Sequence, residues 1–320
     1  MSSALSFDVI FVNNSGNFRS FTERHVITLT EKLNVILFSD PDQWGKSFSK
    51  CNGKQQSPID IDTSAVEYDG LLNRFQLEGL RTVSDVKMVM QNNGHTVQID
   101  LRGKQLNVSG GSLPGQYIVG QFHFHWGTEE KRGSEHAING KHYPMEMHVV
   151  TYSQKYDNVK DAMAEPGGLA VLGFFIEVGN HNEQFETIIN HLHNIDHKDD
   201  HVKLDSFYLT NLFPSTKYYY RYYGSLTTPP CYESVIWTIF KEQVQISELQ
   251  LNRFRALGQT LFIENGDLIN NYRNPQPLYG RKVTSNDKRY IKDLFIIMSM
   301  KKYYLEIGNT TYYSINCKVQ

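Results

Sequence analysis

Two histidines one residue apart, His123 and His125, lie in the segment QFHFHWG, and a third, His148, follows in MEMHVV. Because successive side chains of a β-strand point to opposite faces, residues two apart share a face. His123 and His125 are therefore expected to direct their imidazoles to one point, with Phe124 on the other side. His148 lies in a second alternating segment, 145–152, which can pair beside the first. Three converging imidazoles that leave a fourth position open form the ligand set of a catalytic zinc ion, whereas structural zinc sites are closed, usually by thiolates.

A His-x-His pair alone is a weak signal, because two partly exposed strand histidines are a common alternative. The neighbouring acceptors make it stronger. Gln121 lies two residues before His123, and Glu146 lies two residues before His148, so each acceptor shares a face with its histidine. A zinc-binding histidine needs an acceptor on its second ring nitrogen, which fixes the tautomer and the orientation of the ring. We therefore expect Gln121 and Glu146 to orient the metal ligands.

Eight segments of the chain, in this order, closely resemble the α-class carbonic anhydrases. They are QSPIDI (56–61), NNGH (92–95), QFHFHWG (121–127), GSEH (133–136), MEMHVV (145–150), GLAVLGFF (168–175), GSLTTPPC (224–231) and NPQPL (274–278). The resemblance runs from about Trp44 to about Arg281 and covers neither end. It implies an α+β, β-dominated fold: a single domain with a large, mostly antiparallel, twisted central sheet of about ten strands, flanked by short helices.

The spacing of apolar residues fits this fold. Period-two patterns predict strands at 86–90, 96–101, 120–125, 145–152, 169–178 and 235–240. Helical periodicity predicts helices over 182–194 and 247–257. The second helix begins with a capping box from Ser247 to Gln250, and either Leu249 or Leu251 is expected to be buried with Phe254 and Leu257.

The predicted organisation has three parts: a divergent N-terminal segment at 1–40, a carbonic anhydrase domain at 41–283, and a C-terminal extension of unassigned role at 284–320. The first segment does not match the family, which normally carries a Trp-Gly-Tyr motif near the cleft. One alternative is therefore that residues 1–39 are foreign to the domain and impair its folding.

Composition excludes some classes of partner. The 320 residues include 32 basic and 34 acidic side chains, which gives a net charge of −2 and predicts no nucleic-acid or anionic-membrane role. No run of about 18 apolar residues occurs, so no membrane-spanning helix is predicted. A monomer is expected.

The chain has three cysteines, and the resemblance pairs Cys51 with Cys231, as in secreted and membrane-bound relatives. A persistent disulfide implies an oxidising compartment, so an extracellular protein is predicted. The first residues do not form a recognisable signal peptide, which leaves a cytoplasmic location open. The sequons at Asn13, Asn107 and Asn309 fit secretion, although such tripeptides often arise by chance.

The activity that the resemblance implies is the reversible hydration of CO2 to bicarbonate and a proton, with Zn2+ as cofactor and sulfonamides as expected inhibitors. Three neutral imidazoles leave the dication its full charge, which favours a zinc-bound hydroxide as nucleophile at neutral pH. The resemblance implies that the Thr227 hydroxyl accepts a hydrogen bond from this hydroxide. Thr227 then donates to Glu135, because an ionised carboxylate can only accept. Thr228 is expected to line the bicarbonate site.

Carbon dioxide is small and apolar, so it needs a dry wall beside the metal. The resemblance assigns this wall to Val150, Val171, Leu226, Val235 and Trp237, which are equally suited to plain core packing.

Each turnover leaves a proton to be removed, and a partly exposed histidine can relay it near neutral pH. His95 matches the family's shuttle, with Asn93 and Gln98 expected to hold the intervening waters. The alternative for His95 is an ordinary solvated loop residue.

A different class of function is an acatalytic carbonic-anhydrase-like module used for binding or adhesion. Such relatives have usually lost a zinc histidine. All three histidines are present here together with Glu135 and Thr227, which favours the enzyme.

Overall fold

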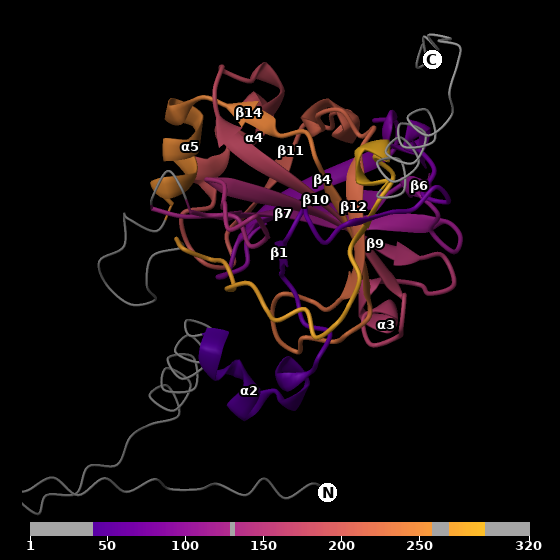
Figure 1. Ribbon diagram of the computed structural model, residues 1–320. Coiled ribbons are helices and arrows are strands. Elements are labelled where there is room, and N and C mark those ends of the chain that lie inside the picture. Colours follow the sequence, from indigo (N-terminus) through magenta and orange to yellow (C-terminus); the bar gives the residue numbers. More distant parts are fainter. Residues whose placement is uncertain (1–40, 129–131, 258–268, 292–320) are drawn as a thin grey trace, which may run out of the picture.

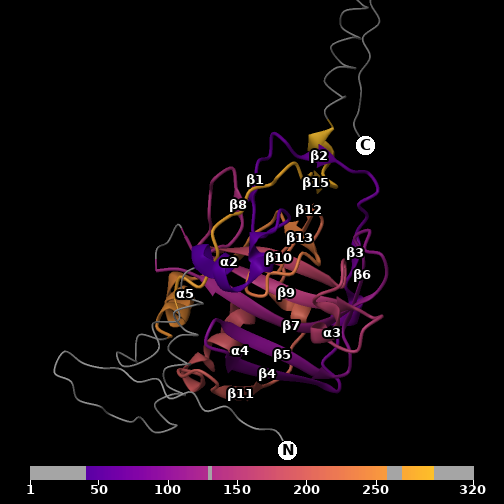
Figure 2. The same ribbon diagram turned by 90° about the horizontal axis from the view of Figure 1, so that it is seen from below.

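The computed structural model describes residues 41–128, 132–257 and 269–291, and one large twisted mixed sheet dominates them (Figures 1 and 2). Its main path contains ten strands. In spatial order these are β11 (His201–Leu204), β4 (Val86–Asn92), β5 (Val97–Gly103), β7 (Tyr117–Trp126), β9 (Met145–Ser153), β10 (Leu169–Val178), β13 (Val235–Phe240), β12 (Tyr219–Gly224), β15 (Thr284–Ser285) and β2 (Glu67–Tyr68). The predicted fold class is confirmed.

Shorter elements complete the described part. Strand β14 (Val244–Ile246) pairs with β10, and β6 (Asn107–Gly110) joins β7 to β3 (Phe75–Gln76), while β1 (Asp60–Ile61) and β8 (Ala137–Ile138) form a separate parallel pair. The α-helices are α2 (Trp44–Ser47), α3 (Val159–Ala162), α4 (Glu186–Ile189) and α5 (Glu248–Arg255). No helix in these residues has both the length and the apolarity needed to cross a bilayer.

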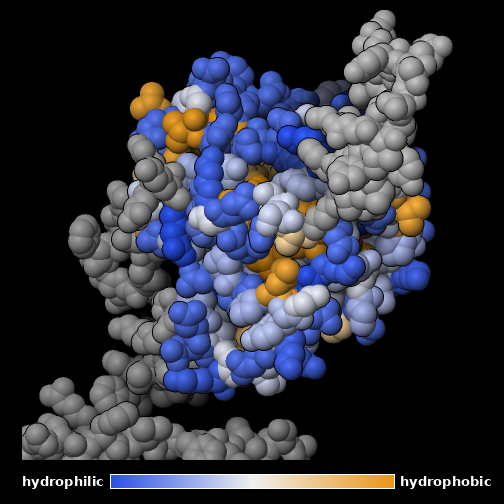
Figure 3. All heavy atoms as spheres, viewed as in Figure 1, coloured by the Kyte–Doolittle hydropathy of each residue, from blue (hydrophilic) through white to orange (hydrophobic). Residues whose placement is uncertain are grey.

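The sheet buries a different set of side chains on each face. Phe122, Phe124 and Trp126 of β7 pack into the larger apolar core with Met145 and Met147 of β9. Each such side chain contributes about 1.5–3 kcal/mol when fully buried. The residues between them point the other way, as the period-two pattern predicts, and the second apolar core lies on that side. Most of the face seen in Figure 3 is hydrophilic, with hydrophobic residues near its centre and a second group at the upper left.

Antiparallel pairing sets β7 and β9 in register. His123 lies directly opposite His148, and His125 lies opposite Glu146. On the other side of β7, Gln98 of β5 lies opposite His123. A slip of one residue would move the histidines to the apolar face, so burial of that face fixes the register.

Strand β7 contains a β-bulge at Gly120, where the pairing with β9 shifts between Val119 and Gln121. Simple alternation would place Val119 on the face of Gln121 and His123, but Val119 packs in the larger apolar core. A Cβ atom at Gly120 would lie 2.6 Å from Cγ2 of Val159, so glycine allows this close approach. Bulges of this kind re-aim side chains.

The helix predicted over 247–257 is present as α5. The Ser247–Gln250 capping box forms as expected. Leu251, Phe254 and Leu257 are buried, whereas Leu249 is 79% exposed, which decides between the two leucines.

The prediction of one continuous helix over 182–194 is wrong. The segment forms a 3-10 turn (Glu183–Phe185), the short α4, and a second 3-10 turn (Leu192–Asn194). The N–H of His191 bonds to the carbonyl of Ile188, three residues earlier, so the last turns tighten. The four apolar residues that suggested a helix are nevertheless buried: Phe185, Ile188, Ile189 and Leu192.

A disulfide joins Cys51 to Cys231, 180 residues apart in sequence, as predicted. Both cysteines are buried, and Gln56 Nε2 donates to the Cys231 carbonyl at 3.2 Å. The cross-link therefore ties the N-terminal edge of the described chain to the loop that carries Thr227. Cross-links over long loops stabilise a fold by about 2–5 kcal/mol. The division of the chain at residues 41 and 283 remains a prediction.

Candidate metal centre

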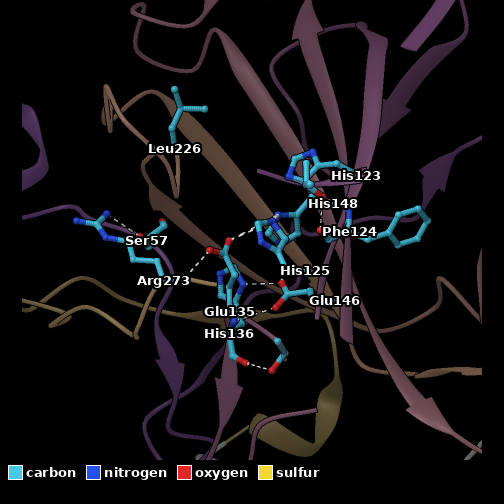
Figure 4. Close-up of polar contacts among 12 residues, drawn as sticks. Ser57, His123, Phe124, His125, Glu135, His136, Glu146, His148, Leu226 and Arg273 are labelled. Carbon is cyan, nitrogen blue, oxygen red and sulfur yellow. Dashed lines mark hydrogen bonds and ion pairs between the residues drawn. The ribbon is translucent and has the colours of Figure 1, made fainter. Parts of the chain in front are cut away.

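Three imidazoles from two strands meet on one face of the sheet. His123 and His125 come from β7 and His148 from β9, and one nitrogen of each lies within 4.8 Å of the others. Nε2 of His125 is 3.1 Å from Nδ1 of His148. Figure 4 shows the three rings turned toward one another while Phe124 points away, as the strand alternation predicted. These histidines could hold a metal ion.

Two of the rings are held by the acceptors expected from the sequence. Nδ1 of His123 lies 2.9 Å from Oε1 of Gln121, and Nε2 of His148 lies 2.7 Å from Oε1 of Glu146. Each acceptor requires the facing nitrogen to carry the proton. Nε2 of His123 and Nδ1 of His148 are thereby left with lone pairs, as a metal ligand requires.

The third ring is held by a residue that the sequence did not reveal. Nδ1 of His125 lies 2.7 Å from the backbone carbonyl of Asn271. The Asn271 side chain also accepts from the Trp126 N–H at 2.8 Å and donates to the carbonyls of Phe124 and His95. Asn271 is 146 residues from His125, so no local pattern could have pointed to it.

One carboxylate serves two histidines at the base of the site. Oε1 of Glu146 is 2.7 Å from both His148 Nε2 and His136 Nδ1, and Oε2 accepts from the His136 N–H at 2.8 Å. Burial alone would raise the pKa of Glu146, but the adjacent His136 and His148 lower it well below its usual value. Nε2 of His136 lies 2.6 Å from the Tyr222 hydroxyl, and this hydroxyl lies 2.9 Å from Ser57 Oγ, to which it donates. The anionic acceptor is thus built into a buried network.

The electrostatics of the site suit a cation. Burial, reinforced by the neighbouring imidazoles, lowers the pKa of His123 well below 6.5. Burial also lowers the pKa of His125, against the opposing effect of Glu135. Both rings are therefore in the neutral form that binds a metal. Oε2 of Glu135 is buried without a hydrogen-bond partner among the described residues, and it lies 3.4 Å from Nε2 of His125. A positive ion among the three nitrogens would offset this charge, so the residues fit a divalent metal.

Arg273, which the sequence did not reveal, holds Glu135 in place. Its backbone N–H donates to Oε1 of Glu135 at 2.9 Å. The buried Arg273 guanidinium donates to Gln56 Oε1 and to the carbonyls of Ser57 and Cys51. Figure 4 shows the Glu135 carboxylate between Arg273 and the histidines.

Thr227 is buried and Thr228 is exposed, both on the loop after β12. No hydrogen bond joins Thr227 to Glu135 in the part of the chain that the structure describes, so the proposed hydroxyl relay between them remains a prediction.

The predicted apolar wall lies beside the histidines. Val150, Val171, Val235 and Trp237 are buried in the second apolar core, with Leu226 packed against it. Val171 of β10 lies opposite Val150 of β9 and Trp237 of β13. The Trp237 and His148 rings have centroids 4.8 Å apart. The binding of carbon dioxide against this wall stays a prediction.

His95 follows the turn between β4 and β5 and is exposed. Asn93 Oδ1 accepts from the His95 N–H at 2.9 Å, and Asn93 Nδ2 donates to Gln98 Oε1 at 3.2 Å. The two amides predicted to hold relay waters therefore contact each other, on the sheet face that carries His123. Their role as water ligands stays a prediction.

Comparison with known proteins identifies the family: the model of the eukaryotic-type carbonic anhydrases matches residues 39–287. The chain belongs to this family. Carbonic anhydrase 7 of Mus musculus is 38% identical over 255 residues, covering 77% of this chain and 94% of that protein. The human carbonic anhydrase 7 is 38% identical over 253 residues, with the same two shares covered. Carbonic anhydrase 1 of Monodelphis domestica is 36% identical over 253 residues, covering 78% of this chain and 95% of that protein. The predicted family is confirmed.

Replacing Glu146 by glutamine keeps the shape of the side chain but removes the charge shared by His136 and His148. We expect the affinity for zinc to fall by about 10–100-fold, the usual cost of losing an acceptor behind a metal ligand. The measurement is competition with a chelator of known affinity. Gln121→Ala is the control, and its loss should be smaller because Gln121 holds one ring and is only half-buried. An unchanged affinity in Glu146→Gln would contradict the role assigned to this carboxylate.

Proposed function

We propose that the protein is a zinc enzyme that reversibly hydrates carbon dioxide to bicarbonate and a proton. The observation that carries this proposal is the set of three converging imidazoles, two buried and one partly buried, each with its second nitrogen held by an acceptor. His123, His125 and His148 would hold the ion. A zinc ion in such a site is a Lewis acid that lowers the pKa of a bound water, an effect for which carbonic anhydrases are themselves the standard example.

Glu135 and Thr227 would set the direction of the hydrogen bonds beside the ion. Glu135 Oε1 accepts a hydrogen bond from the backbone N–H of Arg273, and an ionised carboxylate can only accept. A Thr227 hydroxyl that donates to it keeps a lone pair for the reacting oxygen. Thr228, exposed on the same loop, would contact bicarbonate.

An apolar wall would exclude water from the carbon dioxide binding site. It consists of Val150, Val171, Leu226, Val235 and Trp237. Carbon dioxide has no net dipole and gains little from polar contacts, whereas a dry apolar wall favours it over water. The register of β9, β10 and β13 supports this role, because it sets the wall beside His148.

Val171→Tyr tests the wall. A phenol at this position would fill the space for carbon dioxide, and we expect the rate of hydration to fall by about 100-fold, a loss comparable to that from misplacing a bound substrate. Val171→Ala is the matched control, and it should keep most of the rate because it adds no bulk. Zinc content and thermal unfolding should be measured on both variants. A folded, zinc-loaded Val171→Tyr variant with the normal rate would refute the wall.

His95 would carry the proton from the site to solvent, with Asn93 and Gln98 ordering water between. Partial burial of the His95 ring, and then the nearby Lys198, lower the pKa of His95 below 6.5. The relay needs neutral imidazole to accept a proton, so it works above this pKa and fails as the pH falls through it.

Two variants test the relay by stopped-flow hydration. His95→Ala should lower the buffer-dependent maximal rate, and added imidazole should restore part of it. Lys198→Gln removes a positive charge, so the pKa of His95 should rise and the rate should begin to fall at a higher pH. A rate that does not respond to imidazole in His95→Ala would exclude the shuttle.

The disulfide supports a secreted protein, because such bonds persist in oxidising compartments. Recovery of the chain with its disulfide from the medium of expressing cells is expected; an exclusively intracellular protein with free Cys51 and Cys231 would overturn this. Carbon dioxide and bicarbonate are the proposed small-molecule partners, and sulfonamides the proposed inhibitors. A monomer remains the predicted state.

A further inference from the structure

A cavity of about 730 Å³ lies away from the metal centre. It is bounded by β12, by the segment that leads into β15, and by residues near β2, elements that lie together at one end of the sheet in Figure 2. On β12, Arg221 and Tyr223 alternate with Tyr222, whose hydroxyl belongs to the His136 network. Tyr222 also lines the cavity, so this strand borders both sites.

The most unusual residue of this cavity is Arg221, which is 5% exposed. Its Nε and Nη2 donate to Thr238 Oγ1 at 3.3 and 3.0 Å, and Nη2 also donates to the Gly111 carbonyl at 2.8 Å. Its Nη1 donates to none of the described residues, and no carboxylate among them forms an ion pair with it. Asp69, which also lines the cavity, interacts electrostatically with Arg221 but forms no ion pair with it, so the buried cation is only partly compensated and an anion in the cavity would be favoured.

Two further cations on the rim carry no ion pair with a described residue. Lys54 is exposed, and Arg281 donates only to backbone carbonyls, among them that of Tyr223 at 3.0 Å. Lys282, by contrast, is already paired with Glu67 outside the lining. Asp69 is the one carboxylate that lines the cavity, so the lining as a whole is positive.

The mouth of the cavity is apolar and aromatic. Leu71, Tyr223 and Tyr279 are 82%, 62% and 62% exposed, and they are three of the six large hydrophobic residues that are exposed in the described part of the chain. All three line this cavity. Exposed aromatic side chains gathered around a recess commonly mark a binding site.

We propose that this cavity binds a small organic anion, a carboxylate or phosphate monoester attached to an aromatic or aliphatic group. The anionic group bonds to Nη1 of Arg221, with Lys54 and Arg281 adding positive charge. The apolar part of the ligand packs against Tyr223 and Tyr279. The proposed anion contacts, Arg221, Lys54 and Arg281, are not among the residues that hold the metal.

The test is calorimetric titration of the full-length, zinc-loaded protein with phenyl phosphate and benzoate. A saturating sulfonamide blocks the metal centre throughout. We expect at least one of the two anions to bind, and benzyl alcohol, which has no charge, to bind about tenfold more weakly or worse. Inorganic phosphate should also bind more weakly, because it lacks the apolar part. Equal binding of benzyl alcohol, competition with the sulfonamide, or no binding by either anion would overturn the proposal.

Variants identify the residues. Arg221→Gln and Lys54→Gln should each weaken anion binding, Arg221→Gln by about tenfold or more, with carbon dioxide hydration unchanged. Lys160→Gln, an exposed lysine on α3 away from the cavity lining, is the matched control and should bind normally. If Arg221→Gln fails to fold, Lys54→Gln and Tyr223→Ala decide, since both side chains are exposed. Unchanged affinity in these variants would contradict the proposed site.

Discussion

The whole site depends on three imidazoles, two buried and one partly buried, that each turn one nitrogen toward the others and the second toward an acceptor. A buried ring must satisfy its N–H and still present a lone pair, which requires one acceptor for each histidine, correctly placed. Gln121, Glu146 and the Asn271 carbonyl meet this requirement. Among these three acceptors Glu146 alone is charged, and it accepts from His136 as well as from His148.

This constraint explains the surrounding architecture. The β7–β9 pairing sets two of the histidines opposite each other, and the bulge at Gly120 lets the strand change face before reaching Gln121. Segments distant in sequence then close the site. Arg273 links Glu135 to Ser57 near the disulfide, and the same disulfide holds the loop of Thr227. A metal site needs ligands that are held rigidly by the surrounding residues, and these contacts hold them.

Local patterns in the sequence predicted the parts of this structure that are themselves local. Alternation was enough to put His123, His125 and Gln121 on one face, and a capping box was enough to start α5 at its observed position. The Asn271 carbonyl and the Arg273 amide were missed, because a backbone group has no residue signature and both act over more than 130 residues. The bulge at Gly120 and the broken helix over 182–194 were also missed. The cavity around Arg221 was equally invisible, because nothing in the sequence shows that this strand arginine is buried.

The most direct test of the central claim is a zinc titration of the metal-free protein, followed by stopped-flow measurement of carbon dioxide hydration. We expect the rate to rise in proportion to zinc, to reach its limit at one equivalent, and to disappear with a sulfonamide. We also expect His148→Ala neither to retain zinc nor to hydrate carbon dioxide. A folded protein that binds one zinc ion through these histidines and yet leaves carbon dioxide unhydrated would contradict the proposed enzyme.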